Sequence, residues 1–367
     1  MKIKSVEPIL VSIPWTHNAP RPPATRSHNF DAVNICFARV ETDAGVVGWG
    51  EAFAISGGPV VVKAIAETVA RVAVGREIVG AEKLSDQLRR DTNSVARAGG
   101  AVAFGLAALD TALWDIDGKI AGKPVWALLG GAPRVTIDAY ASLFRIGVPE
   151  HVENVCRAAV GRGFRKIKLH EHTVEAVAAA RRGAGPGVDI MVDVNCYWTS
   201  IDEIVAFCEG AERHGVAWLE EPLYPTDDYE AHAELRRRVK TPISSGENIA
   251  TLGELKAIIA AKGIDIAQPS PAKLGGITGV WRAVQMARAA GARCVPHSPF
   301  HGPALIAAAH IVAAAPVNEP LELRYCDLEA NPLHPFGVWR DGAFALPQAP
   351  GLGVEIDMDV VKKYRVL

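Results

Sequence analysis

From about residue 133 onward, short apolar runs alternate with Ala-rich segments of about a dozen residues. Runs that alternate with helical segments in this way are typical of buried strands in a parallel sheet. Eight such runs favour closure into a barrel over an open, doubly wound sheet. The sequence therefore predicts eight strands with seven helical stretches between them. The eight runs are VTIDAYAS, RKIKLH, DIMVDVN, AWLEEP, PISSGE, DIAQPS, RCVPHS and LELRY.

The first part of the chain has a different pattern, typical of an α+β domain. KIKSVEPILVSI alternates polar and apolar residues, and VNICFARVETDAGVVGWGEA predicts a hairpin that turns at Asp43-Ala44-Gly45. A helix is predicted next, because apolar residues recur at steps of three and four until Gly122 and Pro124 end the pattern. The apolar stripe of this helix consists of Leu106, Leu109, Leu113, Ile116 and Ile120.

These patterns divide the chain into three parts. We expect the α+β domain over residues 1–125 and the barrel over residues 126–325. Residues 326–367 are turn-rich and too short to fold alone, so we expect them to pack back on the N-terminal domain.

Composition limits the classes of protein to which this chain can belong. Hydrophobic residues make up 49% and charged residues 22%, so the chain is globular and can bury a sizeable core. The net charge is −2 without a long run of one sign, which argues against nucleic-acid and membrane partners. Six scattered cysteines without a C-x-x-C pair indicate reduced thiols, so we expect a cytoplasmic protein.

Three acidic residues, Asp193, Glu220 and Glu247, lie at equal steps of 27 residues, and each ends an apolar run. A strand, a helix and two loops take roughly this length, since a βαβ unit has about 30 residues. The acids are therefore expected at matching ends of three neighbouring parallel strands. Three carboxylates supply oxygen ligands but no sulfur and no imidazole, which suits Mg²⁺ rather than zinc.

The same count marks polar residues on the other strands, at the ends where barrel enzymes place their active sites. From Lys168 onward the steps are 25, 27, 27, 23, 27 and 25 residues. Lys166 and Lys168 are two apart, as are Asp193 and Asn195, which puts each pair on one face of a strand. The full set of strand-end residues is Lys168, Asp193, Glu220, Glu247, Ser270, His297 and Glu322.

These residue types suit the removal of a proton next to a carboxylate. The resulting enediolate carries two charges on adjacent oxygens, and a bound metal stabilises that charge as it develops. Lys168 can act as the base once its pKa is lowered, and both the neighbouring Lys166 and the metal would push that pKa down. His297, on the far side of the barrel, can supply or take a second proton.

The motifs resemble the enolase superfamily, and within it the mandelate racemase and muconate lactonizing enzyme group, over nearly the whole chain. K-x-K is present at 166–168, D-x-N at 193–195, E-x-P at 220–222 and G-E-N at 246–248. The helical segment at 107–131 and PGLGVEID near the end are also similar to this group. The resemblance implies an α/β fold, a (β/α)7β modified TIM barrel with an α+β N-terminal capping domain.

The resemblance also implies roles for the strand-end residues. It places Mg²⁺ on the three acids, makes Lys168 the general base with Lys166 assisting, and makes His297 the catalytic histidine of the seventh strand. A small carboxylate is the implied substrate. Barrels of this group usually assemble, so we expect a homo-oligomer.

The sequence departs from the group at one place. Racemase-type members have an aspartate five residues before a Gly-Gly pair, where it orients the histidine, and muconate lactonizing types have a lysine base there. Here the place holds Ser270, and Lys273 is expected to lie off the catalytic face. Imidazole basicity and tautomer are less controlled without that carboxylate. We therefore favour dehydration of a hydroxylated acid such as a sugar acid, with Lys168 as base and His297 as acid.

Two alternatives stay open beside dehydration. A racemase, epimerase or cycloisomerase would use the same enediolate intermediate. A catalytically silent barrel with a binding role is more remote, because the three metal ligands and the K-x-K motif are intact.

Other polar residues are candidates for substrate contacts. Asn195, Glu322 and His170 are candidates by strand position, although a loop histidine is the favoured alternative for His170 and Glu322 could equally pair with Arg324 or another cation. Glu221 is expected to face away from Glu220 by strand alternation, toward a cation behind the strand. The Pro-rich stretch 14–30 is a predicted lid that favours an anionic or polyhydroxylated substrate. Its polar residues are His17, Arg21, Arg26 and His28.

Overall fold

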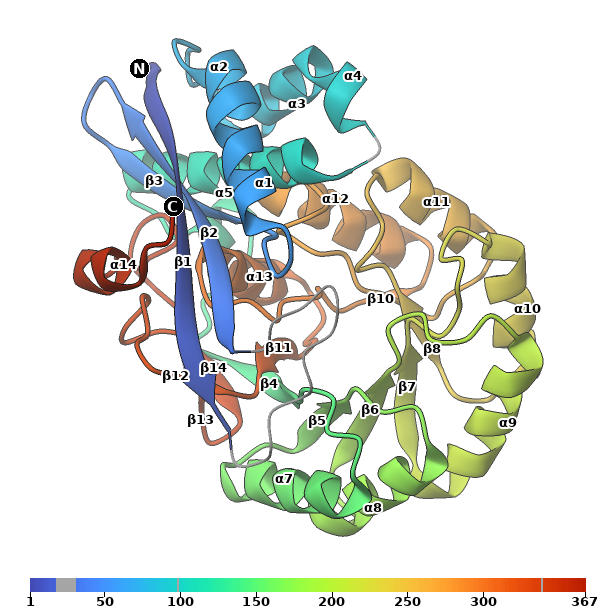
Figure 1. Cartoon of the computed structure of the whole chain (residues 1–367). Helices are drawn as coiled ribbons and strands as arrows, with labels where there is room; N and C mark the ends of the chain where they lie inside the picture. The colour runs from blue at the N-terminus through green and yellow to red at the C-terminus, as the bar shows by residue number, and fades with distance from the viewer. Residues whose placement is uncertain (18–30, 98, 338) are drawn as a thin grey trace.

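The structure is a computed structural model that describes residues 1–17, 31–97, 99–337 and 339–367. Figure 1 shows an N-terminal sheet covered by helices, beside a ring of helices that surrounds a parallel sheet. Most of the predicted lid, including Arg21, Arg26 and His28, lies outside the described residues. Within the described ranges, no helix is long and apolar enough to cross a membrane.

The N-terminal domain contains the predicted antiparallel strands, β1 (Ile3–Thr16), β2 (Ala32–Thr42) and β3 (Val47–Ala52). The predicted hairpin between β2 and β3 is confirmed. Gly45 has φ 79° in its turn, a conformation that glycine adopts without strain. The helices of this domain are α1 (Gly58–Ala64), the π-helical turn η1 (Ile65–Val69), α2 (Ala70–Ala73), α3 (Ala81–Asp91), α4 (Asn93–Ala96), α5 (Ala101–Ala121) and α6 (Val125–Leu128).

Helix α5 is the helix predicted from the apolar stripe, and it ends at Gly122, which has φ 64°. Ile120 is the exception to the predicted stripe, since 52% of its surface is exposed. The helix packs closely on β3, because a Cβ atom at Gly50 would lie 1.8 Å from the carbonyl oxygen of Ala108. Through this contact the helix packs directly on the sheet, so the capping domain has one layer of helices and one layer of strands.

The barrel contains all eight predicted strands, with the seven predicted helical stretches between them. The strands are parallel and lie in the order β10-β9-β8-β7-β6-β5-β4, with β11 on the edge of β4 that faces away from β5. The strands are β4 (Thr136–Ser142), β5 (Lys166–Leu169), β6 (Asp189–Asp193), β7 (Val216–Glu220), β8 (Ile243–Ser245), β9 (Ile266–Ala267), β10 (Arg293–Cys294) and β11 (Leu321–Arg324). The helices are α7 (Pro149–Gly161), α8 (Val174–Ala184), α9 (Ile201–Ala211) with the 3₁₀ turn η2 (Glu212–His214), α10 (Tyr229–Arg238), α11 (Leu252–Ala260), α12 (Gly276–Ala289) and α13 (Pro303–Ala314).

Ser298 joins the two ends of the barrel sheet. It follows β10, and its backbone N–H donates to the Glu322 carboxylate at 2.9 Å while its hydroxyl donates to the Glu322 carbonyl at 3.1 Å. The interior below the strand ends is filled by large apolar side chains, so the barrel is a packed core with its mouth at the carboxyl ends. These interior residues are Tyr140, Met191, Trp218, Ile266 and Val295.

The C-terminal segment contacts both parts of the molecule. Strand β12 (Asp327–Leu328) pairs with β1, and the chain beyond α14 (Met358–Tyr364) also reaches β1 through the bridge of Val11 with Arg365. Strand β14 (Ala343–Ala345) pairs with β4 of the barrel and with β13 (Trp339–Arg340). The predicted domain boundaries at residues 125 and 325 stay predictions. All six cysteines are free.

Candidate active site

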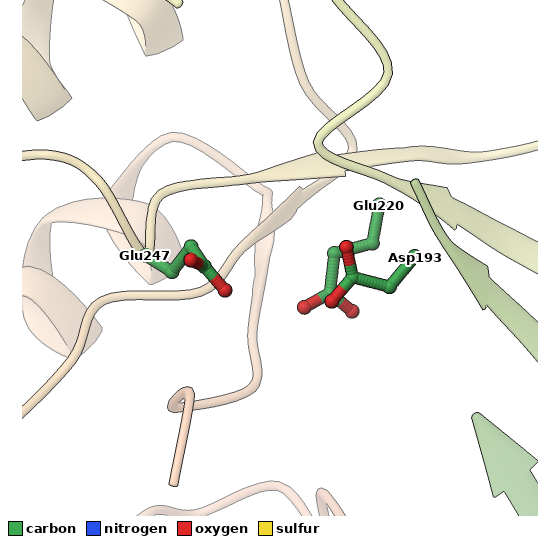
Figure 2. A group of neighbouring side chains, drawn as sticks. All are labelled: Asp193, Glu220 and Glu247. Carbon is green, nitrogen blue, oxygen red and sulfur yellow. The ribbon is translucent and has the colours of Figure 1, made fainter. Parts of the chain in front are cut away.

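The three acids at 27-residue spacing converge at the mouth of the barrel. Asp193 ends β6 and Glu220 ends β7, where the two residues are partners in the parallel register. Glu247 lies just beyond β8, and Figure 2 shows its carboxylate pointing toward the other two. One oxygen from each carboxylate lies within 4.8 Å of the others, a separation that one cation could bridge. The spacing in the sequence thus predicted this cluster.

Glu221 holds the loop that carries Glu247. Its backbone has φ 44°, and its buried carboxylate accepts hydrogen bonds from the backbone N–H groups of Gly246 at 2.8 Å and Glu247 at 3.2 Å. The Ser245 hydroxyl donates to the same oxygen at 3.1 Å. The expectation of a cation behind the strand is therefore wrong, because backbone and hydroxyl donors occupy this carboxylate.

Glu220 is held by donors that the sequence analysis missed. The side chain of Gln268 donates to its Oε2 atom at 2.9 Å, and the Trp218 indole N–H lies 3.2 Å from the same oxygen. Gln268 is two residues before Ser270, so the strand alternation that selected Ser270 could also have found it.

Lys168 lies beneath the acid cluster and is almost completely buried. Its Nζ atom is 2.7 Å from Glu220, 2.8 Å from Glu322 and 3.2 Å from Asp193. Burial alone would lower the pKa of Lys168, but these carboxylates outweigh burial and hold the pKa well above its usual range. Lys168 was expected to act as the base, a role that requires a lowered pKa, so the raised pKa differs from that expectation.

The structure separates Lys166 from Lys168. Both side chains lie on one face of β5, but successive residues of that face are about 6.6 Å apart along the strand. Lys166 is level with Asp189 at the start of β6, and its ammonium group pairs with the exposed carboxylate of Asp138 at 2.5 Å. Lys166 therefore lies at the opposite end of the barrel from the acid cluster, where it cannot assist Lys168 as expected.

His170, just beyond the end of β5, lies at the mouth of the barrel. Leu169 is level with Val192 in the register, so His170 is level with Asp193, and its Nε2 atom is 3.2 Å from the Asp193 carboxylate. The Nδ1 atom of His170 contacts the backbone carbonyl of Leu143. His170 thus lies beside the acid cluster and not in a distant loop.

His297 approaches the acids from the opposite side. Its Nε2 atom is 2.9 Å from the Glu247 carboxylate, and the ring is nearly buried. The Nδ1 atom of His297 and the hydroxyl of Ser270 are both buried without a hydrogen-bond partner in the described part of the chain. A direct hydrogen bond between Ser270 and His297 is therefore not formed.

Lys273 also lies beside the site, in contrast to its expected position off the catalytic face. Its ammonium group is 3.7 Å from the Glu247 carboxylate and 3.3 Å from the side-chain oxygen of Asn248. It also lies 4.2 Å from the centre of the Phe53 ring. Ser270 begins a turn rather than continuing a strand, so strand alternation does not extend to Lys273.

Three further predicted residues lie around the same space. Asn195 donates to the Asp193 carboxylate at 2.8 Å, and the buried Glu322 carboxylate pairs with Lys168. The His17 ring is 4.9 Å from that of Trp15, which lines the cavity. The cavity has a volume of about 400 Å³. Its polar lining includes Asp193, Asn195, Glu247, His170, His297 and Glu322.

The donor set fits a divalent cation. Burial raises the pKa of Glu220 well above its usual range, and the charges of Asp193 and Glu322 add to this rise despite Lys168. By formal charge, the carboxylates of Asp193, Glu220, Glu247 and Glu322 face only two ammonium groups, those of Lys168 and Lys273. Carboxylate oxygens are the donors that Mg²⁺, Ca²⁺ and Mn²⁺ prefer.

Family comparisons agree with this geometry. Residues 7–130 match the family described as mandelate racemase / muconate lactonizing enzyme, N-terminal domain, and residues 150–360 match the enolase C-terminal domain-like family. The chain belongs to the enolase superfamily. Within the superfamily it falls in the mandelate racemase and muconate lactonizing enzyme group, and the predicted capping domain and (β/α)7β barrel are confirmed.

Characterised members of the superfamily are similar over almost the whole chain. A D-galactarolactone cycloisomerase from Agrobacterium fabrum is 30% identical, with 100% of this chain and 99% of the relative covered. An arabinonate dehydratase from Saccharolobus solfataricus is also 30% identical, with 91% of each chain covered. These relatives confirm the prediction of an enzyme, a lyase or an isomerase, rather than a silent binding barrel.

A solved structure extends the likeness to the whole fold. The mandelate racemase/muconate lactonizing protein from Paracoccus denitrificans, complexed with magnesium, has a TM-score of 0.84 and is 28% identical. The match covers 99% of this chain and 97% of the Paracoccus chain. Enolase superfamily enzymes use a metal ion, and this chain has an acidic cluster that could hold one.

Proposed function

We propose that this enzyme is a Mg²⁺-dependent dehydratase that removes the proton α to a carboxylate and expels a hydroxyl group from a sugar acid. The observation that carries the proposal is the pair of imidazoles on opposite sides of the acid cluster. His170 contacts Asp193 and His297 contacts Glu247, and the two rings have different hydrogen-bond partners. That difference supports one base and one acid.

His170 is the proposed base. A backbone carbonyl only accepts hydrogen bonds, so the contact with the Leu143 carbonyl requires a proton on Nδ1. In the neutral ring this leaves the lone pair on Nε2, which lies 3.2 Å from the Asp193 carboxylate and would be free to act as a base once a metal ion binds that carboxylate. A lone pair at that position can take the α-proton of a substrate in the cavity.

His297 is the proposed acid. Its Nε2 atom lies against an acceptor, the Glu247 carboxylate, so the proton of the neutral ring is placed on Nε2. The opposite nitrogen has no partner among the described residues. When the ring is protonated on both nitrogens, its Nε2 proton can be given to a leaving hydroxyl group, which departs as water, and the ring returns to its neutral form. Solvent then returns a proton to His297 and takes one from His170.

Asp193, Glu220 and Glu247 would hold the Mg²⁺ ion, which when bound stabilises the negative charge that develops on the substrate carboxylate. Lys168 keeps its proton among three carboxylates, so its proposed role is a fixed positive charge below the site rather than the base. Glu322 stays ionised, since Lys168 holds the pKa of Glu322 at about 2 although burial opposes this. Asn195 orients Asp193 and is a proposed substrate contact.

A cycloisomerase is the second candidate, favoured by the relative from Agrobacterium fabrum that is similar over the whole chain. It would share the removal of the α-proton but would retain all atoms of the substrate. A racemase fits less well, because His297 lacks a carboxylate at Ser270 that would orient it for symmetric proton transfer.

Screening a panel of sugar acids and their lactones with Mg²⁺ tests the proposal. Mass spectrometry should show loss of one water from at least one acid, and the reaction in D₂O should reveal exchange of the α-proton. A product of unchanged mass would favour the cycloisomerase, and an inverted substrate of unchanged mass would favour the racemase. Exchange with neither outcome would contradict dehydration.

The other expected properties are part of the same proposal. The six free cysteines support a reducing, cytoplasmic location, and a homo-oligomer is expected from the superfamily group. Light scattering of the purified protein would measure its assembly.

A further inference from the structure

Arg324 ends β11 and lines the cavity beside the metal site. It is two residues beyond Glu322 and therefore on the same face of the strand, nearer the barrel mouth. Its guanidinium carbon lies 4.8 Å from the centre of the Phe144 ring, a stacking contact that holds the planar group at the cavity wall. Arg145, just beyond the neighbouring strand β4, lines the same cavity at its rim.

The guanidinium groups of Arg324 and Arg145 form no hydrogen bond or ion pair with a residue in the described part of the chain. Arg282, which is also partly buried, pairs with Asp86 at 2.8 Å. A guanidinium has five N–H donors, and its removal from water costs free energy unless an anion compensates. The half-buried Arg324 is therefore a cation without a direct ion pair among the described residues, although its charge helps to lower the pKa of the nearby Glu322.

A count of formal charges shows what is missing. The cluster around the metal site has four carboxylates and two ammonium groups, so one divalent cation balances it. His301, which also lines the cavity, adds no charge, because burial and Arg324 lower its pKa to about 3. The two arginines remain, and a ligand with two carboxylates carries the charge that balances them.

We propose that Arg324, with Arg145 at the rim, binds a second carboxylate of the substrate, so that the enzyme prefers sugar diacids to sugar acids with one carboxylate. The inference rests on the proposed function, because the first carboxylate must occupy the metal site. Arg324 can bind a carboxylate through two parallel N–H···O bonds, which would fix the far end of an extended substrate.

A matched pair of substrates tests the inference: one sugar oxidised at both ends and the same sugar oxidised at one end, each with Mg²⁺. We expect kcat/KM to be at least about tenfold higher for the diacid, mainly through a lower KM. Equal or better turnover of the monoacid, or a preference for a phosphorylated sugar acid, would overturn the inference and leave the proposed function standing. No turnover of any sugar acid would overturn both.

The variant Arg324→Gln assigns the preference to this residue. The ratio of kcat/KM for diacid over monoacid should fall by about ten- to a hundredfold, because a charge-assisted pair is lost. Arg324→Lys should recover part of the ratio, since an ammonium group keeps the charge but not the fork. The control Arg238→Gln, on α10, removes a surface pair with Asp202 of α9 and should leave the ratio as it is in the parent enzyme. An unchanged ratio in Arg324→Gln would refute the assignment.

Inhibition of the unmodified enzyme covers the case in which Arg324→Gln does not fold. Simple dicarboxylates should compete with the substrate at least about tenfold better than monocarboxylates of the same chain length. Equal inhibition by the two series would count against a second carboxylate site.

Discussion

The Nζ atom of Lys168 lies 2.7 Å from the Glu220 carboxylate, in a part of the barrel where neither side chain reaches solvent. Lys168→Met removes the cation that Glu220, Glu322 and Asp193 share. Without metal, the free energy of unfolding should fall by roughly 3–5 kcal/mol, since buried carboxylates lose their partner. Urea unfolding in the presence of a chelator measures this loss, and added Mg²⁺ should restore more stability to the variant than to the parent. A loss below about 1 kcal/mol would contradict the buried ion pairs.

Lys166→Met is the matched comparison on the same strand. Lys166 pairs with an exposed carboxylate at the other end of the barrel, and exposed pairs contribute about 0–1 kcal/mol. Stability and kcat should both stay close to those of the parent enzyme. A loss of turnover greater than about tenfold would return Lys166 to the catalytic set.

The two lysines show what the sequence can and cannot predict. Alternation along a strand correctly put Lys166, Lys168 and His170 on one face. Alternation does not tell how far along the barrel axis each side chain lies, because that depends on the register of β5 with β6. The register places His170, and not Lys168, level with Asp193. The acid cluster was predictable because residues at equal spacing in successive βα units lie at the same level along the barrel axis and on the same face of their strands.

The remaining errors fall where the chain leaves a strand. Glu221 has a positive φ, so its carboxylate turns back to the loop of Glu247 instead of pointing behind the sheet. Lys273 lies in a turn and reaches Glu247, although alternation predicted otherwise. Backbone conformation at such positions depends on tertiary contacts, and local sequence alone does not determine it.

Glu247→Gln should weaken Mg²⁺ binding by at least about tenfold, because the variant loses one of three anionic ligands. Isothermal titration calorimetry of the metal-free protein gives the affinity directly, without any assay of turnover. The same substitution at the exposed Glu209 on α9 should leave the affinity unchanged. Equal Mg²⁺ affinity in the Glu247 variant and the parent would rule out Glu247 as a ligand.

The two histidines should separate the two halves of the reaction. His170→Asn removes the proposed base, so exchange of the substrate α-proton in D₂O should fall by about 10²–10⁴-fold. His297→Asn should lower water loss by a similar factor and should lower exchange less, because the base is retained. NMR of the substrate in D₂O measures exchange, and mass spectrometry measures the product. If exchange survives in His170→Asn and disappears in His297→Asn, the roles of the two rings are reversed.

His310 should make the stability of the protein depend on pH. Its Nδ1 atom accepts a hydrogen bond from the Trp126 N–H at 3.2 Å, and its Nε2 atom lies 3.0 Å from the Leu352 carbonyl, so only the neutral ring fits. Burial lowers its pKa to about 4, whereas an unfolded histidine has a pKa near 6.5. The unfolded chain therefore binds more protons below pH 6.5, and stability is lost as the pH falls from there toward 4.

His310→Gln keeps one donor and one acceptor but does not titrate in this range. We expect the free energy of unfolding of the parent protein to fall more steeply than that of the variant, by roughly 2 kcal/mol between pH 7 and pH 5. Urea unfolding of the metal-free proteins at several pH values measures the difference. His334→Gln, which changes an exposed histidine, should follow the parent curve. Parallel curves for the parent and His310→Gln would show that the buried ring does not set this acid sensitivity.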